Sequence, residues 1–128
     1  MGQVNLVVSS RNHLIVMEFK VIRIDFLAIG NASGRLAKAK ALKELEVGQV
    51  LDLKFEKKDV HRQGMTIREW IEQDVRPQLK DYVTSLEVKE RIEERGLRAH
   101  LVLIVGSRQI LIQDMDEDGA WIEGPMLL

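Results

Sequence analysis

Two apolar runs joined by a short polar link open the chain, and they constrain its fold more than any other feature. Residues 4–9 and 13–24 are rich in Val, Ile, Leu and Phe, with Arg11 and Asn12 at the centre of the link. β-Branched and aromatic residues favour strands, and so short a polar link favours a tight turn. We predict an antiparallel hairpin here, with a second strand that can continue as far as Ile29.

The predicted turn fixes which residues of the two strands face each other. Asn5 then lies opposite Glu18, and successive side chains alternate between the two faces of the sheet. One face is wholly apolar, and we expect it to pack on the core; its members are Val4, Leu6, Val8, Ile15, Met17 and Phe19. The other face is half apolar, which predicts a sheet covered on both faces. Its polar side chains gather at one end, at Asn5, Glu18 and Lys20.

The middle of the chain combines helix and strand patterns. Strong helix formers over residues 35–45 predict a short amphipathic helix, which follows the breaker residues 30–34. Residues 47–57 alternate apolar and polar side chains, which predicts a strand, and the polar residues 57–64 predict a loop. The spacing of Thr66 and Glu69 is that of a capping box, so a helix should begin there.

The remainder of the chain continues this mixed pattern. Pro77 interrupts the apolar stripe of the helix, so it should kink the helix or lie in the first turn of a second one. Gly96 should end the helical region. The apolar residues 100–106 and 108–114 predict a further pair of strands. The sequence therefore predicts an α/β fold with a mixed β-sheet and flanking helices.

Composition narrows the class of protein. The chain has 128 residues, which fits a single domain, and its net charge is −1, so no overall field points to nucleic acid or a membrane. It has no cysteine, which excludes disulfides and thiolate metal sites and fits a reducing compartment. It shows no apolar run long enough for a membrane helix. We expect a cytoplasmic domain that does not bind membranes.

The polar end of the hairpin and a later helix together resemble the PD-(D/E)XK nuclease superfamily. Proteins of this family carry an acidic residue on one strand, then a turn, then (D/E)-x-K on the next strand. Here Gly2, the apolar strands and Glu18-Phe19-Lys20 match that order, and Asn5 stands where the metal-binding Asp belongs. The segment Gln78–Tyr82, "QLKDY", is similar to a Q-x-x-x-Y helix motif of some branches, and an apolar strand follows it.

This resemblance implies a restriction-endonuclease-like core in a single domain of residues 1–128, with a helix-strand insertion at about residues 25–65. It also implies an endonuclease that uses Mg²⁺ or Mn²⁺, because a divalent cation activates water and offsets charge on the scissile phosphate. Glu18 would be a catalytic metal ligand and Lys20 the catalytic lysine. Gln78 would position the lysine or the DNA.

Asn5 departs from the family pattern, and it predicts impaired or lost hydrolysis. An amide oxygen brings no charge, whereas magnesium sites rely on one or two carboxylates. An engineered Asp→Asn change, a degenerate family member, or another carboxylate at the metal, such as Asp25 or Glu72, would each account for it. The family also places a helix before the hairpin, which a longer parent protein or a partner copy would supply.

Basic residues suggest where nucleic acid, DNA above all, would bind. Residues 32–62 carry eight Lys and Arg against five Asp and Glu. Lysine and arginine neutralise phosphates, so we assign nucleic-acid contacts to Lys54, Lys57, Lys58 and Arg62, together with Tyr82. A solvated helix and strand would explain the same charges without any ligand.

Two weaker patterns have simpler explanations. Residues 114–125 place Asp114, Asp116 and Asp118 as in a calcium loop, but Pro125 stands where a bidentate Glu belongs, so we expect an acidic β-turn. The three histidines show no ligand spacing and are expected at turns or on the surface; they are His13, His61 and His100.

Other hypotheses compete with the nuclease-like one. Glu18 and Lys20 could be charges that protect an edge strand from aggregation. The chain would then be a non-enzymatic protein-interaction domain of mixed α/β architecture, or a small β-barrel-like binding domain. The nuclease-like hypothesis alone requires Asn5, Glu18, Lys20 and Gln78 to converge in one concave site.

Overall fold

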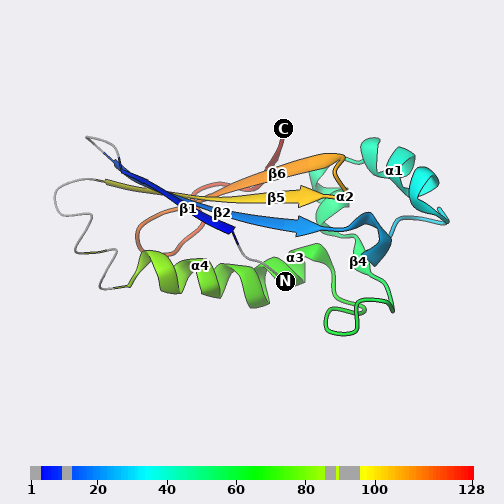
Figure 1. Ribbon diagram of the computed structural model, residues 1–128, viewed down its shortest axis with the longest axis horizontal. Coiled ribbons are helices and arrows are strands. Elements are labelled where there is room, and N and C mark those ends of the chain that lie inside the picture. Colours follow the sequence, from blue (N-terminus) through cyan, green and yellow to red (C-terminus); the bar gives the residue numbers. More distant parts are fainter. Residues whose placement is uncertain (1–3, 10–12, 86–88, 90–95) are drawn as a thin grey trace.

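The computed structural model describes residues 4–9, 13–85, 89 and 96–128, and it is a mixed α/β structure built on a five-stranded sheet (Figure 1). The strands lie in the order β1 (Val4–Ser9), β2 (His13–Ile22), β5 (Gly96–Val105), β6 (Gln109–Met115) and β7 (Met126–Leu127). β2 and β5 are parallel and the other neighbours are antiparallel. The predicted α/β class with a mixed sheet is confirmed. The sheet is open, with β1 and β7 at its edges, and is not the barrel considered above.

The chain between β2 and β5 forms two groups of elements. The first group lies beyond one end of the sheet and comprises η1 (Ile24–Phe26), β3 (Leu27–Ala28), α1 (Arg35–Lys43), α2 (Val47–Leu51) and β4 (Lys54–Phe55). The second group runs back along one face of the sheet and comprises α3 (Ile67–Trp70), the π-helix η2 (Ile71–Val75) and α4 (Arg76–Val83) (Figure 1).

The N-terminal hairpin has the predicted register. Asn5 pairs with Glu18 and Val7 with Val16, as a tight turn requires, although residues 10–12 lie outside the described part of the chain. β2 is shorter than predicted, because it ends at Ile22 and is followed by the 3-10 turn of η1 rather than by more strand.

The prediction of which hairpin face covers the core was wrong. Leu14, Val16 and Ile22 are fully buried and belong to the core, together with the facing residues of β5. On the face predicted to be the core, Ile15, Met17 and Phe19 are only half-buried. Both faces of β2 are rich in apolar residues, so alternation alone could not decide between them.

Residues 47–57 are also not the predicted strand. Glu46 and Gln49 form a capping box that begins α2, and Val50 and Leu51 are both buried on the inner side of this short helix. Only Lys54 and Phe55 pair as strand, against β3. The spacing of the apolar residues fits the two-residue period of a strand, but the Glu46–Gln49 capping box begins a helical turn instead.

The helices that cross the sheet begin and turn as predicted. Thr66 accepts a hydrogen bond from the Glu69 backbone N–H, which confirms the capping box. Pro77 lies in the first turn of α4, one of the two positions predicted for it, and the preceding turn is a π-helix. Proline lacks an N–H and cannot donate an α-helical hydrogen bond to the previous turn. Its absence from the hydrogen-bond pattern favours a π-helical turn just before it.

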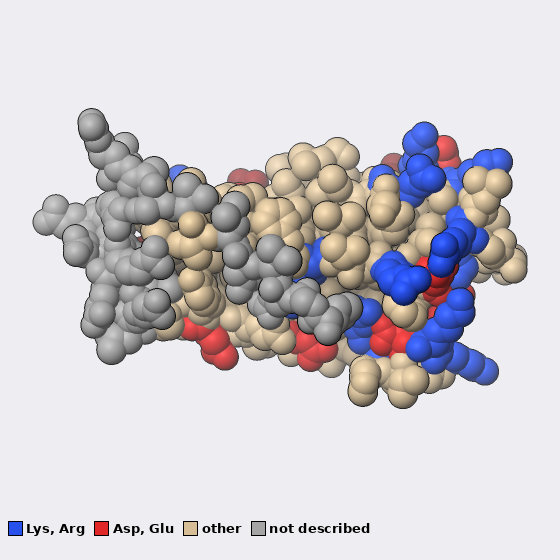
Figure 2. Space-filling view, in the orientation of Figure 1, with Lys and Arg blue, Asp and Glu red and all other residues tan. Residues whose placement is uncertain are grey.

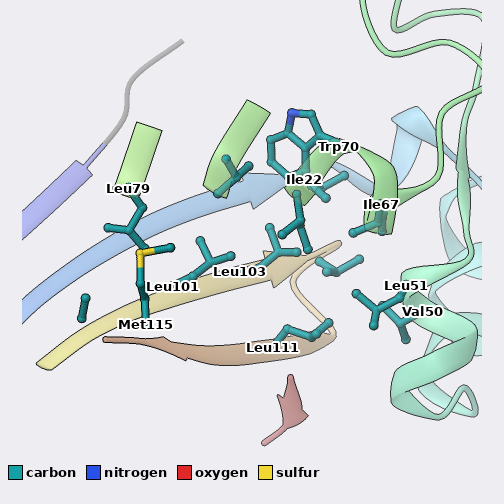
Figure 3. Close-up of a cluster of buried hydrophobic side chains, with 14 of the residues drawn as sticks. Ile22, Val50, Leu51, Ile67, Trp70, Leu79, Leu101, Leu103, Leu111 and Met115 are labelled. Carbon is teal, nitrogen blue, oxygen red and sulfur yellow. The ribbon is translucent and has the colours of Figure 1, made fainter. Parts of the chain in front are cut away.

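The core fills the space between the sheet and the α3–α4 segment (Figure 3). Leu101 and Leu103 of β5 point toward the helix residues Leu79 and Trp70, while Val50 and Leu51 of α2 close the end next to Leu111 (Figure 3). Each fully buried Leu or Ile contributes about 1.5–3 kcal/mol relative to exposure, so this layer fixes α4 against β2 and β5.

The loop of residues 56–65, between β4 and α3, is anchored by one arginine. The Arg62 guanidinium lies 4.2 Å from the centre of the Phe55 ring and 4.9 Å from that of Trp70, and its Nε donates to Asp59 at 2.6 Å. Although it is an arginine, Arg62 is only 9% exposed. Stacking and ion pairing together therefore hold the loop against the helix.

Arg62→Lys keeps the charge but loses the planar guanidinium that lies over the Phe55 and Trp70 rings. We expect the free energy of unfolding to fall by about 1–2 kcal/mol, measured by urea denaturation. Arg68→Lys is the control, because the Arg68–Asp52 pair is exposed and should change stability by less than about 0.5 kcal/mol. Equal effects of the two substitutions would contradict the anchoring role of Arg62.

Candidate functional site

Glu18, Lys20 and Gln78 come together where α4 crosses β2. The Lys20 Nζ lies 3.4 Å from Glu18 Oε1 and 3.4 Å from Gln78 Oε1, and it donates to the latter. Glu18 and Lys20 lie two residues apart on one face of the strand, whereas Gln78 comes from the first half of α4. The packing of the helix on the sheet thus joins residues that are 58 positions apart in the sequence.

Glu18 is only 1% exposed, in a sheet face that is otherwise part of the core. β2 lies between β1 and β5, so Glu18 and Lys20 are not on an edge strand, and protection of an edge does not explain them. Burying a carboxylate costs several kcal/mol even when a cation compensates it. A fold that needed only stability would place an apolar residue here, which makes Glu18 a candidate functional residue.

A pocket of about 550 Å³ opens beside the Lys20 ammonium. Gln78, Asp74 and Trp70 of the crossing helices form one wall, and the 56–65 loop forms the other. The π-helical turn of η2 carries Asp74 and ends three residues before Gln78, and such turns are frequent at functional sites. The site is therefore concave, with Lys20 at its base.

The described residues do not by themselves fit a magnesium ion. No three His, Cys, Asp or Glu side chains of the described chain lie close enough together to hold a metal. Of the two ligands that the motif predicts, Glu18 and Asn5, the structure describes the side chain of Glu18 alone, and that carboxylate is already paired with the Lys20 ammonium. The Asn5 backbone pairs with Glu18, but the Asn5 side chain lies outside what the structure describes. Its amide would add no charge.

The two alternative carboxylates suggested by the sequence have other partners. Asp25 accepts hydrogen bonds from Arg35 at 2.8 and 2.9 Å, in a different pocket from Lys20. Glu72 accepts the indole N–H of Trp121 at 2.9 Å and pairs with Arg76. Two other carboxylates, which no sequence motif indicated, line the Lys20 pocket: Asp74, and Asp59, which is paired with Arg62.

The predicted nucleic-acid contacts divide into exposed and buried groups. Lys54, Lys57 and Lys58 are exposed, and Figure 2 shows lysine and arginine gathered at the end of the molecule that carries α1 and β4. Lys58 also lines the Lys20 pocket. Arg62 is instead buried in its stack, and Tyr82 is half-buried against the core. Of the five residues predicted to contact nucleic acid, the three lysines are therefore the exposed ones.

A second polar pair lies on the opposite face of the sheet and was missed from the sequence. His100 Nδ1 lies 2.6 Å from Asp114 Oδ1, beside a pocket of about 330 Å³ that Met17, Ile112 and Met126 also line. The β5–β6 register places these two residues opposite each other, so the predicted strand pair could have revealed them.

The acidic turn after β6 forms as predicted. The Asp116 carboxylate accepts the backbone N–H groups of Asp118 and Ala120 at 2.9 and 3.0 Å, and the Gly119 N–H bonds the Asp116 carbonyl. Asp114 and Asp116 therefore serve hydrogen bonds within the protein.

Comparison with family models, with curated proteins and with solved structures gives no match for this chain. In the part of the chain that the structure describes, no helix has the length and apolarity needed to cross a membrane. Function is therefore inferred from the chemistry of the site itself.

Lys20→Met tests whether the ion pair stabilises the buried carboxylate. We expect the free energy of unfolding to fall by about 2–3 kcal/mol, because the buried Glu18 carboxylate loses the Lys20 ammonium. The double variant Glu18→Gln/Lys20→Met should recover at least about 1 kcal/mol of that loss, because it removes the buried charge as well. Urea denaturation of both single variants and the double variant measures the coupling. Lys40→Met, on an exposed lysine, is the control. Additive losses would contradict a direct interaction.

Arg35→Met tests the Asp25 pair. Hydrogen bonds from Arg35 hold the pKa of Asp25 below its ordinary value of 3.8, so this variant should raise that pKa, measured by NMR titration of the carboxyl carbon. Because the pKa is lowered in the folded state, the pair stabilises the protein above pH 3.8, and this contribution is lost as the pH falls through the folded pKa. Arg23→Met, whose contact with Asp25 is longer at 3.4 Å, should have a smaller effect.

Proposed function

We propose that this chain is a nuclease-like domain that binds nucleic acid, and that Asn5 impairs its metal-dependent phosphodiester hydrolysis. The observation that supports this proposal most is the convergence of Glu18 and Gln78 on the Lys20 ammonium, beside the pocket that Lys20 and Gln78 line. The PD-(D/E)XK resemblance requires that convergence, and nothing in the hairpin sequence alone demands that Gln78 reach Lys20.

The chemistry of the pocket suits a phosphate group. Lys20 brings a positive charge to the base of a recess from which water is partly excluded, and its side chain is 17% exposed. Fixed charges act more strongly in such surroundings than in open water, so Lys20 can stabilise negative charge on a phosphoryl group. Lys58 on the facing loop, with Lys54 and Lys57 nearby in the chain, supplies further phosphate contacts.

Gln78 is a positioning residue in this proposal. Its amide oxygen accepts from the Lys20 ammonium at 3.4 Å, at the long end of hydrogen bonding, and such contacts often shorten when substrate binds. The buried Glu18 holds the ammonium from the other side. These two acceptors fix the direction in which Lys20 presents its remaining donor.

Hydrolysis is proposed to be impaired because of the residue at position 5. The register puts Asn5 beside the buried carboxylate, where the family carries an aspartate. Glu18 is already paired with Lys20, and Asn5 carries no charge, so the negative charge that a magnesium site needs is not reached. Binding of nucleic acid does not need that charge. We also propose a cytoplasmic location and assembly with a second copy of the chain.

A protein-interaction domain is the second candidate. The sheet face opposite α4 carries half-buried apolar residues of β2 and the 330 Å³ pocket with its His100–Asp114 pair, and Met126 beside it is 58% exposed. An apolar surface with a few polar groups is typical of protein-binding sites. Failure of nucleic acid to bind would favour this candidate.

Asn5→Asp tests the nuclease-like proposal. The added carboxylate should produce Mg²⁺- or Mn²⁺-dependent cleavage of labelled DNA, with a rate on the order of 100-fold above that of the parent chain, because metal assistance contributes several kcal/mol. Gel assays of single-stranded, duplex and branched substrates measure it. Asn5→Asp/Lys20→Ala should lose the gained activity.

Asn31→Asp is the matched control, because it makes the same change at an exposed position outside the pocket. It should leave cleavage at the level of the parent chain. Cleavage by Asn5→Asp that persists in the Lys20→Ala background would contradict the role of Lys20. No cleavage by any variant, together with no binding of DNA or RNA, would overturn the proposal.

A further inference from the structure

The pocket beside Lys20 has an apolar wall that phosphodiester hydrolysis does not require. Phe26 of η1 and Trp70 of α3 line it, and Val60 of the 56–65 loop is 78% exposed at its rim. A valine so exposed contributes little to the core, and its side chain is available to contact a ligand in the pocket, because ligand pockets are lined mainly by apolar side chains.

The wall that carries Val60 is held in place. Arg62 fastens the loop to Phe55 and Trp70, and backbone hydrogen bonds from Gly64 to Phe55 and from Met65 to Arg62 close its base at 3.1 and 2.9 Å. The loop projects away from the sheet past α3 (Figure 1). The recess is therefore preorganised, because the 56–65 loop that forms one of its walls is already held in place without a ligand.

Cationic, acidic and apolar groups all line this recess; of the acidic ones, Asp59 is paired with Arg62 and Asp74 lies on the helix side. Lys20 lies at its base, while Lys58 and His61 stand beside Val60 on the loop, and all four line the same pocket. An ammonium binds a phosphate, an imidazole N–H can donate to one, and an apolar wall accepts the flat face of a base. The volume of about 550 Å³ suits one or two nucleotides, because it is that of a site for a drug-sized molecule.

We infer that this pocket takes an unpaired nucleotide, so that the nucleic acid bound here is single-stranded at the Lys20 site. This inference rests on the proposed function and specifies its substrate class. In a duplex the base faces are stacked on one another and hidden, so they cannot lie against the apolar side of the pocket at Phe26 and Val60. An unpaired strand exposes those faces and can pass its phosphates between Lys20 and Lys58.

Binding can be measured without hydrolysis, in EDTA, by two readouts. Anisotropy of a fluorescein-labelled 12-nucleotide oligothymidine gives the Kd, and a blunt duplex of mixed sequence is the comparison. In a Trp121→Phe background, Trp70 is the sole tryptophan and reports on the pocket itself. We expect the single strand to bind at least ten times more tightly than the duplex, and to quench Trp70.

Three variants and one control locate the binding. Val60→Ser, Lys58→Gln and His61→Gln should each weaken single-strand binding by about three- to tenfold, since each removes one contact. Arg98→Gln removes one charge from an exposed residue of β5 that does not line the pocket, and it should change the Kd by less than twofold.

The outcomes separate this inference from the proposed function. Equal or tighter binding of the duplex, together with duplex cleavage by Asn5→Asp, would overturn the single-strand inference and leave the nuclease-like function standing. Single-strand binding that quenches Trp70, with no cleavage by Asn5→Asp, would support the inference and overturn hydrolysis. Binding that Val60→Ser and Lys58→Gln leave unchanged would place the strand elsewhere and overturn the inference.

Discussion

The parallel pairing of β2 with β5 is the constraint on which the rest of this structure depends. The register runs from His13 opposite Gly96 to Ile22 opposite Val105, so the whole length of the hairpin strand is tied to the second half of the chain. Parallel neighbours need a crossover, and here α3, η2 and α4 return along one face of the sheet. That crossover buries Leu14, Val16 and Ile22 and also places Gln78 over Lys20.

The described part of the chain buries three charged side chains, Glu18, Lys38 and Arg62, and two of them, Glu18 and Arg62, bear on the candidate site in different ways. Glu18 is buried at the candidate site, and the Lys20 ammonium offsets part of the free-energy cost of burying its carboxylate. The pocket opens next to that ammonium. Arg62 is buried over the rings of Phe55 and Trp70, which contact each other edge to face, and it fixes the loop side of the same pocket. One charged residue thus belongs to the proposed chemistry, and the other shapes the recess in which it would occur.

Local sequence signals were reliable where short-range chemistry decides the structure. The hairpin register, the capping box at Thr66 and the place of Pro77 each depend on neighbouring residues, and each was predicted correctly. The strand predicted over residues 47–57 was wrong because its apolar residues also fit a helical turn, which the Glu46–Gln49 cap selects. The roles of Arg62 and Asp74 could not be predicted, because both depend on residues brought close only by the fold.

The sequence by itself determined that the chain is mixed α/β and that Asn5 faces Glu18 across a hairpin, and it indicated Glu18, Lys20 and Gln78 as candidate site residues. Only the tertiary structure decided which face of β2 is buried, since both faces are apolar enough to pack and the crossover helices cover just one. It also decided that Gln78 reaches Lys20 and that Asp25 and Glu72 do not line the Lys20 pocket. Strand register follows from the turn, whereas the meeting of distant side chains follows from how layers pack, which no local pattern specifies.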